Sequence, residues 1–267
     1  MFIGGKEFSD KKTHVMGILN VTPDSFSDGG RFVTMDKVLA RADEMMQEGV
    51  AVIDVGGEST RPGYTMISDQ EEISRVVPAI EAIKARIDVP ISIDTYKSTV
   101  AEAAICAGAD MVNDIWGLQF DPKMAKMIKL YDVTVAITHN KNKADYNDFE
   151  KDIVAELKHL ADMAVQNNIS KDKIMLDPGV GFAKSTDQNL ATIRLIPEFV
   201  KLGYPVLLGA SRKSVIGNTL GLPIDDRLEG TLATTAVAVH SGAGFVRVHD
   251  VKENVRLIKM LEAIRES

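Results

Sequence analysis

Short apolar segments alternate with longer amphipathic segments along the whole chain. Eight of the short segments are rich in Val, Ile, Leu and Met on both faces: 15–19, 50–55, 91–93, 111–115, 134–138, 173–176, 206–208 and 244–248. Strands that are apolar on both faces are typical of a buried parallel sheet. The segments between them carry apolar residues at helical spacing, for example in 73–83, 149–160 and 255–264. The pattern therefore predicts eight strand–helix units.

Several helix boundaries are also visible in the sequence. Ser68 followed by Glu71 indicates a capping box at the start of one helix, and Pro78 predicts either a kink or a later start of that helix. Residues 101–107 predict a short helix that ends at Gly108. Cys106 falls on an apolar face of this helix, so we expect it to be buried.

Eight strand–helix units in 267 residues predict a single-domain (β/α)8 barrel, residues 1–267, with 1–13 as a short N-terminal lead-in. A doubly wound open sheet is the alternative, but that fold needs a glycine-rich phosphate turn after its first strand. Here the first strand is followed by residues 20–24, Asn-Val-Thr-Pro-Asp, which contain no glycine. The barrel is therefore the favoured architecture.

Polar residues gather where the predicted strands end. In chain order these are Asn20, Asp54, Asp94, Asn113, His139, Asp177, Lys213, Arg247 and His249. In a (β/α)8 barrel the carboxyl ends of all strands meet on one face, where active sites lie. The set combines acceptors with cationic donors, which suits a ligand that carries both a donor-rich heterocycle and an anionic group.

Two long polar loops are expected after the first and second strands. The first spans 22–31 and contains one large apolar residue, Phe26; the second spans 56–63. Both compositions are typical of mobile segments that close over a site, although plain exposed loops would look similar. We interpret Asp54 and Glu58 as hydrogen-bonding anchors of the second loop and leave them out of the predicted ligand site.

Composition excludes several classes of function. The formal net charge is −7, from 31 Lys and Arg against 38 Asp and Glu, so a general nucleic-acid or anionic-membrane surface is not expected. The chain has one cysteine, no apolar run long enough to span a membrane and no apolar leader in its first twelve residues, which favours a soluble, cytoplasmic protein. Zinc, iron–sulfur and P-loop motifs are absent from the sequence.

Seven motifs together give a more specific identification. They are residues 16–30 (MGILNVTPDSFSDGG), 54–63 (DVGGESTRPG), 92–95 (SIDT), 112–115 (VNDI), 177–182 (DPGVGF), 211–214 (SRKS) and 247–250 (RVHD). In this order the chain resembles the dihydropteroate synthase family over essentially its whole length. The resemblance implies a (β/α)8 barrel that joins 6-hydroxymethyl-7,8-dihydropterin diphosphate to 4-aminobenzoate, with release of diphosphate.

The resemblance also implies roles for individual residues. The pterin diphosphate site would comprise Thr60, Asp94, Asn113, Ile115, Asp177, Phe182, Lys213, Arg247 and His249. The 4-aminobenzoate site would comprise Phe26, Thr60, Pro62 and Ser214. The expected cofactor is Mg²⁺, and Asn20 would be its protein ligand, because Mg²⁺ prefers oxygen donors. Asp28, Lys213 and Arg247 are the candidate catalytic residues.

The family's reaction is dissociative, so diphosphate departs before the arylamine attacks. An arylamine that attacks a cationic pterin methylene needs little deprotonation beforehand, which fits the lack of a candidate general base in the sequence. Two rivals remain open: a pterin-binding methyltransferase domain, and a catalytically silent pterin-binding paralogue. The intact anion-binding residues Arg247 and His249 and the loop at 22–31 favour the synthase over both.

The chain departs from the family pattern at two positions: Thr138 stands where Met is usual, and Ala183 where Gly is common. Residues 231–239 form a predicted helix without a charged stripe, whereas an outer barrel helix normally shows a polar face to water. We therefore expect this helix to lie in a homodimer interface, as is usual in the family. The remaining partners expected are the two small-molecule substrates.

Overall fold

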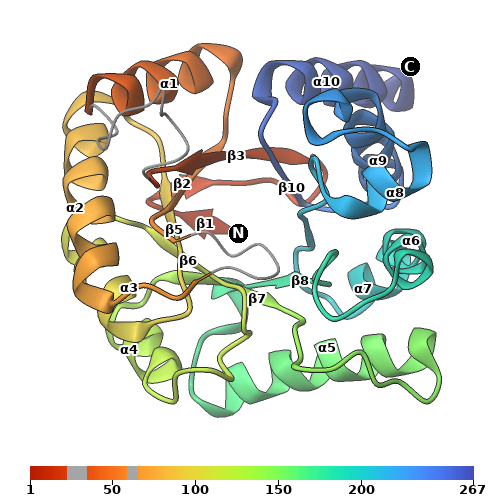
Figure 1. The fold of residues 1–267 in the computed structure, drawn as a ribbon, viewed down its shortest axis with the longest axis horizontal. Helices are drawn as coiled ribbons and strands as arrows, with labels where there is room; N and C mark the ends of the chain where they lie inside the picture. Colours follow the sequence, from red (N-terminus) through yellow and green to blue (C-terminus); the bar gives the residue numbers. More distant parts are fainter. Residues whose placement is uncertain (23–34, 59–64) are drawn as a thin grey trace.

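Eight parallel strands form a barrel surrounded by helices in the computed structural model, which describes residues 1–22, 35–58 and 65–267 (Figure 1). The barrel strands are β3 (His14–Asn20), β4 (Val52–Gly56), β5 (Ile91–Asp94), β6 (Met111–Asp114), β7 (Thr134–Thr138), β8 (Ile174–Asp177), β9 (Leu207–Leu208) and β10 (Phe245–Val248). Each coincides with one of the eight apolar segments. The predicted single (β/α)8 barrel is confirmed.

The strands are paired in the order β8-β7-β6-β5-β4-β3-β10-β9. A parallel bridge between Leu176 and Val206 joins the two ends of this order and closes the barrel. Because β9 has only two residues, this seam is the most weakly paired part of the wall.

The outer helices follow the strands in sequence. They are α1 (Met35–Glu48), α2 (Asp69–Arg86), α3 (Ser98–Cys106), α4 (Met124–Tyr131), α5 (Phe149–Gln166), α6 (Thr186–Arg194), α7 (Ile196–Val200), α8 (Ser214–Leu220), α9 (Leu228–His240) and α10 (Val251–Glu266), with short 3-10 turns η2 (Lys171–Lys173) and η3 (Ile224–Asp226). Their apolar faces and the outward-facing strand residues form one continuous core. Among the described residues, no helix is long and apolar enough to cross a membrane.

Two helix predictions need correction. Ser68 caps α2 by accepting a hydrogen bond from the Glu71 amide, as expected, but the helix begins at Asp69 and runs through Pro78, so a later start is wrong. Helix α3 ends at Cys106, and Gly108 follows with a φ of +113°. The Cys106 side chain is exposed, not buried, because it lies at the last turn, where the helix leaves the core.

The N-terminal lead-in is itself structured. Strands β1 (Phe2–Ile3) and β2 (Lys6–Glu7) form a hairpin whose Ile3 and following Phe8 pack into the lower end of the barrel. They meet a layer of inward-facing side chains, one from each of seven strands: Met16, Val52, Met111, Ala136, Met175, Leu207 and Phe245. Figure 1 accordingly shows the N-terminus inside the ring of strands. The hairpin closes the end of the barrel opposite the polar strand ends.

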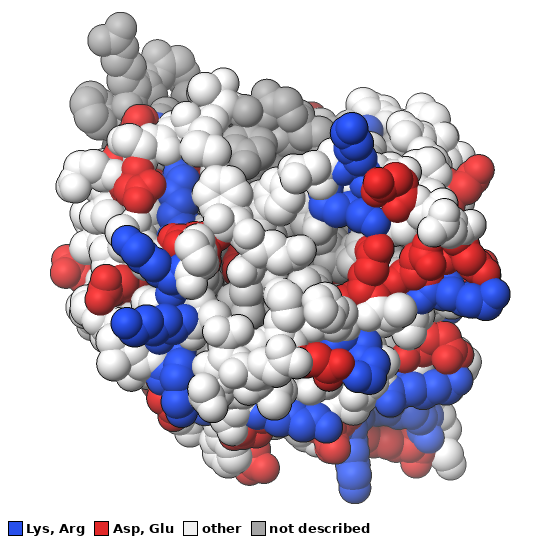
Figure 2. Space-filling view, turned by 90° about the horizontal axis from the view of Figure 1, so that it is seen from below, with Lys and Arg blue, Asp and Glu red and all other residues white. Residues whose placement is uncertain are grey.

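Charged side chains of both signs are interspersed over the face shown in Figure 2. Lys and Arg side chains alternate with Asp and Glu along its margins, and its middle is mostly uncharged. This face therefore presents no extended surface of one sign.

Candidate active site

The inward-facing positions of the strands build the site in layers. Because side chains alternate between the two faces of a strand, the residue two positions after each member of the lower apolar layer also faces inward. This places Asp54, Asn113, Thr138, Asp177, Gly209 and Arg247 in one polar layer above it. Asp94 joins them at the end of β5, beside Asn113 in the strand register.

Arg247 lies at the centre of this layer and holds two carboxylates. Its Nε donates to Asp54 Oδ2 over 2.6 Å and its Nη2 donates to Asp94 Oδ2 over 2.5 Å. Asp54 also accepts from Asn113 Nδ2 over 3.2 Å. Burial raises the pKa of Asp94 to about 7, because the desolvation of the carboxylate outweighs the attraction of the guanidinium. Burial lowers the pKa of the Arg247 guanidinium and the two carboxylates raise it; the net effect is a raised pKa.

Asp54 was interpreted from the sequence as an anchor of the second loop, whereas the structure places it in the polar layer. Its side chain is fully buried and is bonded directly to Arg247 and Asn113. The signal that could have found it is the alternation along β4, which puts Val52, Asp54 and Gly56 on the inner face. Glu58, by contrast, is the anchor that the sequence suggested: it accepts from the Ile67 amide over 2.8 Å and from Tyr96 Oη over 2.6 Å.

A second group of residues lies around Gly209, which follows β9, the strand next to β10. A Cβ built on Gly209 would lie 3.6 Å from Asp177 Oδ2, 3.8 Å from Lys213 Nζ and 3.9 Å from Arg247 Cβ. The lack of a side chain here leaves space between a carboxylate and two cations. Burial raises the pKa of Asp177, although nearby Lys213 opposes this effect, and burial lowers the pKa of Lys213 to about 8.

The loop after β8 holds Lys213 in place. Lys213 Nζ donates to the Val180 carbonyl over 2.6 Å and lies 4.9 Å from the centre of the Phe182 ring. The Gly179 amide donates to Asp177 Oδ1 over 2.7 Å. Gly179 has a φ of +70°, and a Cβ there would collide with the His139 carbonyl, so the loop requires glycine at this point. Ala183, the departure further along the loop, adopts a positive φ of 45°, a region in which glycine is less strained.

A partly buried lysine behind this loop was missed by sequence reasoning. Lys184 Nζ donates to the carbonyls of Gly179 and Phe182 and lies 3.1 Å from His139 Nδ1. On its other side, His139 Nε2 lies 2.6 Å from Glu156 Oε2. Burial lowers the pKa of His139 to about 4 and that of Lys184 to about 7. His139 therefore faces α5 and supports the loop from outside the barrel, whereas Thr138 faces inward.

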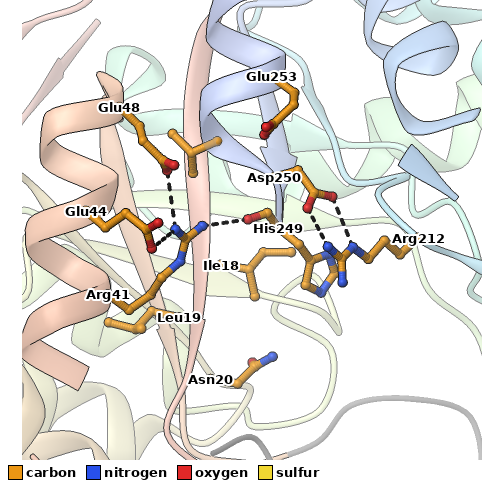
Figure 3. Close-up of a pocket in the computed structure, with 11 residues that line it drawn as sticks. Ile18, Leu19, Asn20, Arg41, Glu44, Glu48, Arg212, His249, Asp250 and Glu253 are labelled. Carbon is orange, nitrogen blue, oxygen red and sulfur yellow. Dashed lines mark hydrogen bonds and ion pairs between the residues drawn. The ribbon is translucent and has the colours of Figure 1, made fainter. Parts of the chain in front are cut away.

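A pocket of about 460 Å³ opens beside the ends of β3 and β10 and is lined by Asn20 and His249 (Figure 3). His249 Nδ1 lies 3.0 Å from Ser211 Oγ, and its carbonyl accepts from Arg41 Nη2 over 2.9 Å. Arg41 in turn pairs with Glu44 and Glu48 on the same helix. The hydrogen bond from Arg41 thus links α1 to the strand end that carries His249.

The other predicted residues are distributed as follows. Ile115 is buried at the end of β6, where its carbonyl accepts from Asn140 Nδ2, and Ser214 is exposed in the first turn of α8, directly after Lys213. Phe26, Asp28, Thr60 and Pro62 lie outside the described residues, as do most of the two predicted loops. The structure thus brings together Asp94, Asn113, Asp177, Lys213 and Arg247, with His249 and Asn20 at the neighbouring pocket.

Comparison with known proteins now places this barrel in a family. A family profile described as pterin binding enzyme matches residues 16–249. The chain is 50% identical over 266 residues to the dihydropteroate synthase of Clostridium beijerinckii, with 99% of each chain covered. This chain belongs to the dihydropteroate synthase family.

Solved structures of family members agree. A dihydropteroate synthase from Clostridium difficile, in the presence of pteroic acid, is 48% identical, with a TM-score of 0.94 and coverage of 98% of this chain and 100% of that one. A Xanthomonas albilineans dihydropteroate synthase with 4-aminobenzoic acid is 37% identical, with a TM-score of 0.95 and coverage of 99% and 97%. The comparisons confirm the family resemblance, the barrel fold and the enzyme class, a transferase of folate biosynthesis.

Proposed function

We propose that this barrel condenses a dihydropterin methyl diphosphate with 4-aminobenzoate at the site around Arg247. The observation that carries the proposal is the convergence of Asp177, Lys213 and Arg247 on the space above Gly209. A carboxylate facing a cationic donor across a buried gap suits a flat ring with N–H donors on one edge and acceptors on the other. The two solved family members are named with pteroic acid, which joins a pterin ring to 4-aminobenzoate, and with 4-aminobenzoic acid itself.

In this scheme each described residue has one task. Asp177 accepts the amino and ring N–H pair of the pterin, and Lys213 donates to the opposite edge. Asp94 and Asn113 bind the ring from the neighbouring strands. Arg247 uses two N–H groups on Asp54 and Asp94, and its remaining N–H groups are available for the diphosphate, with His249 beside it.

The reaction proceeds by departure of the diphosphate first. The methylene C–O bond breaks, its electron pair leaves on the diphosphate, and the electron-rich ring stabilises the cation that remains. The arylamine nitrogen then forms the C–N bond and loses a proton to solvent. Arg247 and His249 stabilise the charge that develops on the leaving group, which is the main electrostatic demand of this step. Asp28 is proposed to lie near the cation, and Phe26, Thr60, Pro62 and Ser214 are proposed to complete the site on the aminobenzoate side.

Asn20 is proposed as the protein ligand of Mg²⁺. A Cβ on Gly56 would lie 3.2 Å from Asn20 Oδ1, so this oxygen lies over the neighbouring strand end, in the pocket that also contains His249. No group of three or more His, Cys, Asp or Glu side chains in the described part of the chain could hold a metal. The donor set therefore fits an ion bound mainly by phosphate oxygens and water, which Mg²⁺ prefers, and such an ion would neutralise diphosphate charge.

The first experiment measures diphosphate release from the pterin diphosphate in the presence of Mg²⁺, with and without 4-aminobenzoate. Formation of dihydropteroate that requires 4-aminobenzoate supports the proposal. Pterin binding without turnover favours the silent paralogue, and methyl transfer to cobalamin favours the methyltransferase. Asp177→Asn should reduce kcat/KM for the pterin substrate at least about 100-fold, because a charged hydrogen-bond acceptor is lost, whereas Glu81→Gln on the exposed face of α2 serves as the matched control.

We also propose that the enzyme is a homodimer built on α9. Val237 on this helix is 41% exposed, and Met260 and Ile264 on the adjoining α10 are 61% and 59% exposed. Exposed apolar side chains on two adjoining helices suit an interaction surface. Light scattering at micromolar concentration should give twice the chain mass, and Val237→Glu should give a monomer. Val165→Glu, a change at a similarly exposed valine on α5, should leave the dimer intact; a monomeric wild type refutes the proposal.

A further inference from the structure

Thr138 is the last residue of β7 and faces the interior of the barrel. Ala136, two positions earlier on the strand, belongs to the lower apolar layer. Thr134, two positions before Ala136, donates from its Oγ1 to the Phe2 carbonyl of the N-terminal hairpin over 3.1 Å. The alternation along the strand therefore brings Thr138 into the polar layer. In the strand register it is the direct neighbour of Asp177.

The hydroxyl of Thr138 is buried without a partner. The residue is 1% exposed, and Oγ1 makes no hydrogen bond within the described residues. Its methyl group faces the loop after β8, since a Cβ on Gly179 would lie 3.3 Å from Thr138 Cγ2. Buried hydroxyls in native proteins nearly always have a partner, so an unpartnered one inside a binding site points to a ligand.

Other polar atoms of the same layer share this property. Asn113 Oδ1 and Asp94 Oδ1 are also buried without a partner among the residues described. Both belong to the site to which the pterin ring is assigned. Thr138 is therefore one more unsatisfied group in the same layer.

We propose that Thr138 Oγ1 accepts a hydrogen bond from the 2-amino group of the pterin and thereby contributes to affinity for that ring. The inference rests on the proposed function. The amino group has two N–H bonds. One of them, together with the adjacent ring N–H, donates to the Asp177 carboxylate, and the second still needs an acceptor. Thr138 is the register neighbour of Asp177, so the two residues share one layer, and the proposal directs the second N–H at the Thr138 hydroxyl. A methionine at this position offers no comparable acceptor.

This role predicts opposite effects on binding and on stability. Thr138→Val keeps the shape of the side chain and removes the hydroxyl, so pterin affinity should fall about five- to tenfold, the usual effect of one neutral hydrogen bond. The unliganded protein should keep its Tm or gain up to about 4 °C, because an unsatisfied buried hydroxyl is removed. Thr138→Ser, which retains the hydroxyl, should bind the pterin more tightly than Thr138→Val does.

The matched control is Thr134→Val, two layers lower on the same strand. Its hydroxyl already has the Phe2 carbonyl as partner, so this change should lower the Tm and leave pterin affinity unchanged. The two valine variants thus separate a hydroxyl that serves the fold from one that serves the ligand.

The test is calorimetric titration of the wild type and the variants with 6-hydroxymethylpterin and with its 2-desamino analogue. We expect Thr138→Val to weaken binding of the first ligand only. Equal loss for both ligands, or no loss at all, overturns the inference while the proposed function stands. If the wild type fails to bind 6-hydroxymethylpterin, the proposed function fails and the inference fails with it.

Discussion

Lys213 is subject to opposing electrostatic effects within a few ångströms. Burial and Arg247 favour its neutral form, whereas Asp177 and Asp94 favour the ammonium, and the balance lowers its pKa to about 8. A lysine that titrates this close to neutrality is unusual for a group whose proposed task is to donate to a ring acceptor. Its charge state therefore sets the upper pH limit of the site.

The affinity of the site for the pterin should fall as the pH rises through about 8, because Lys213 then loses the proton that it donates to the ring. Over the interval from about 8 to 10.5 the free energy of unfolding should instead rise, because the unfolded lysine holds a proton that the folded one has lost. Titration with 6-hydroxymethylpterin between pH 6 and 10 measures the first effect and chemical denaturation the second. Lys213→Arg stays charged throughout, so a persistent decline in that variant would assign the titration to another group.

The structure brings together several residues that the sequence singled out, where chemistry and position agree. Asp94, Asn113, Asp177, Lys213 and Arg247 were identifiable because each polar side chain follows an apolar strand. Lys184 was not identifiable, since nothing in the sequence says that its ammonium turns back beneath the loop to bind two carbonyls. Such a contact depends on the path of the loop, which only the packed structure supplies.

At the scale of elements, a buried ion cluster joins the end of β4 to the segment before α2. Lys97 Nζ donates to Glu58 Oε2 over 2.8 Å, to Glu72 Oε2 over 2.7 Å and to the Ile67 carbonyl over 2.8 Å. Glu58 also accepts from the Ile67 amide, so the amide of Ile67 is bound by Glu58 and its carbonyl by Lys97. Burial raises the pKa of Glu72 even beside this lysine.

Lys97→Met should lower the free energy of unfolding by about 3–5 kcal/mol, because it leaves two carboxylates buried without their cation. The loss should diminish as the pH is lowered, since protonation of Glu72 removes one of the two charges, and Glu72→Gln in the same chain should restore part of the stability at pH 7. Urea denaturation at several pH values measures each effect. Lys151→Met, at a side chain 84% exposed, is the control and should change little; an equally small effect at Lys97 would contradict the prediction.

The elements themselves were predictable to different degrees. All eight barrel strands were found because apolar residues on both faces are a local signal. The N-terminal hairpin was missed because its strands have two residues each, too few to show any alternation. Pro78 was expected to disturb its helix, yet α2 continues through it, since packing of Val76, Ala79, Ile80 and Ile83 holds that helix against the barrel.

At the scale of the whole molecule, the barrel has one closed end and one functional end. The hairpin supplies Ile3, which is 1% exposed, to the closed end, while its neighbour Phe2 is 54% exposed. The polar layer lies at the other end, above the ring of Met16, Val52 and Phe245. Stability and ligand binding should therefore be separable by substitutions at opposite ends.

Ile3→Ala should lower the free energy of unfolding by about 2–4 kcal/mol, as expected for a buried isoleucine, and should leave pterin affinity unchanged. Phe2→Ala at the exposed neighbouring position should cost less than about 1 kcal/mol. Denaturation curves and calorimetric titration of both variants measure the two quantities. Loss of pterin affinity in folded Ile3→Ala would show that the two ends are coupled.

The closed end of the barrel also dictates the route by which molecules enter and leave. Water displaced by an arriving pterin has to exit through the same opening that the pterin uses. The condensed product would have its fused ring deepest and its benzoate end nearest the opening, so it has to depart lengthwise, benzoate end first. Because the ring would have to separate from Asp177 and its neighbours before the product leaves, stronger hydrogen bonds there would slow its release.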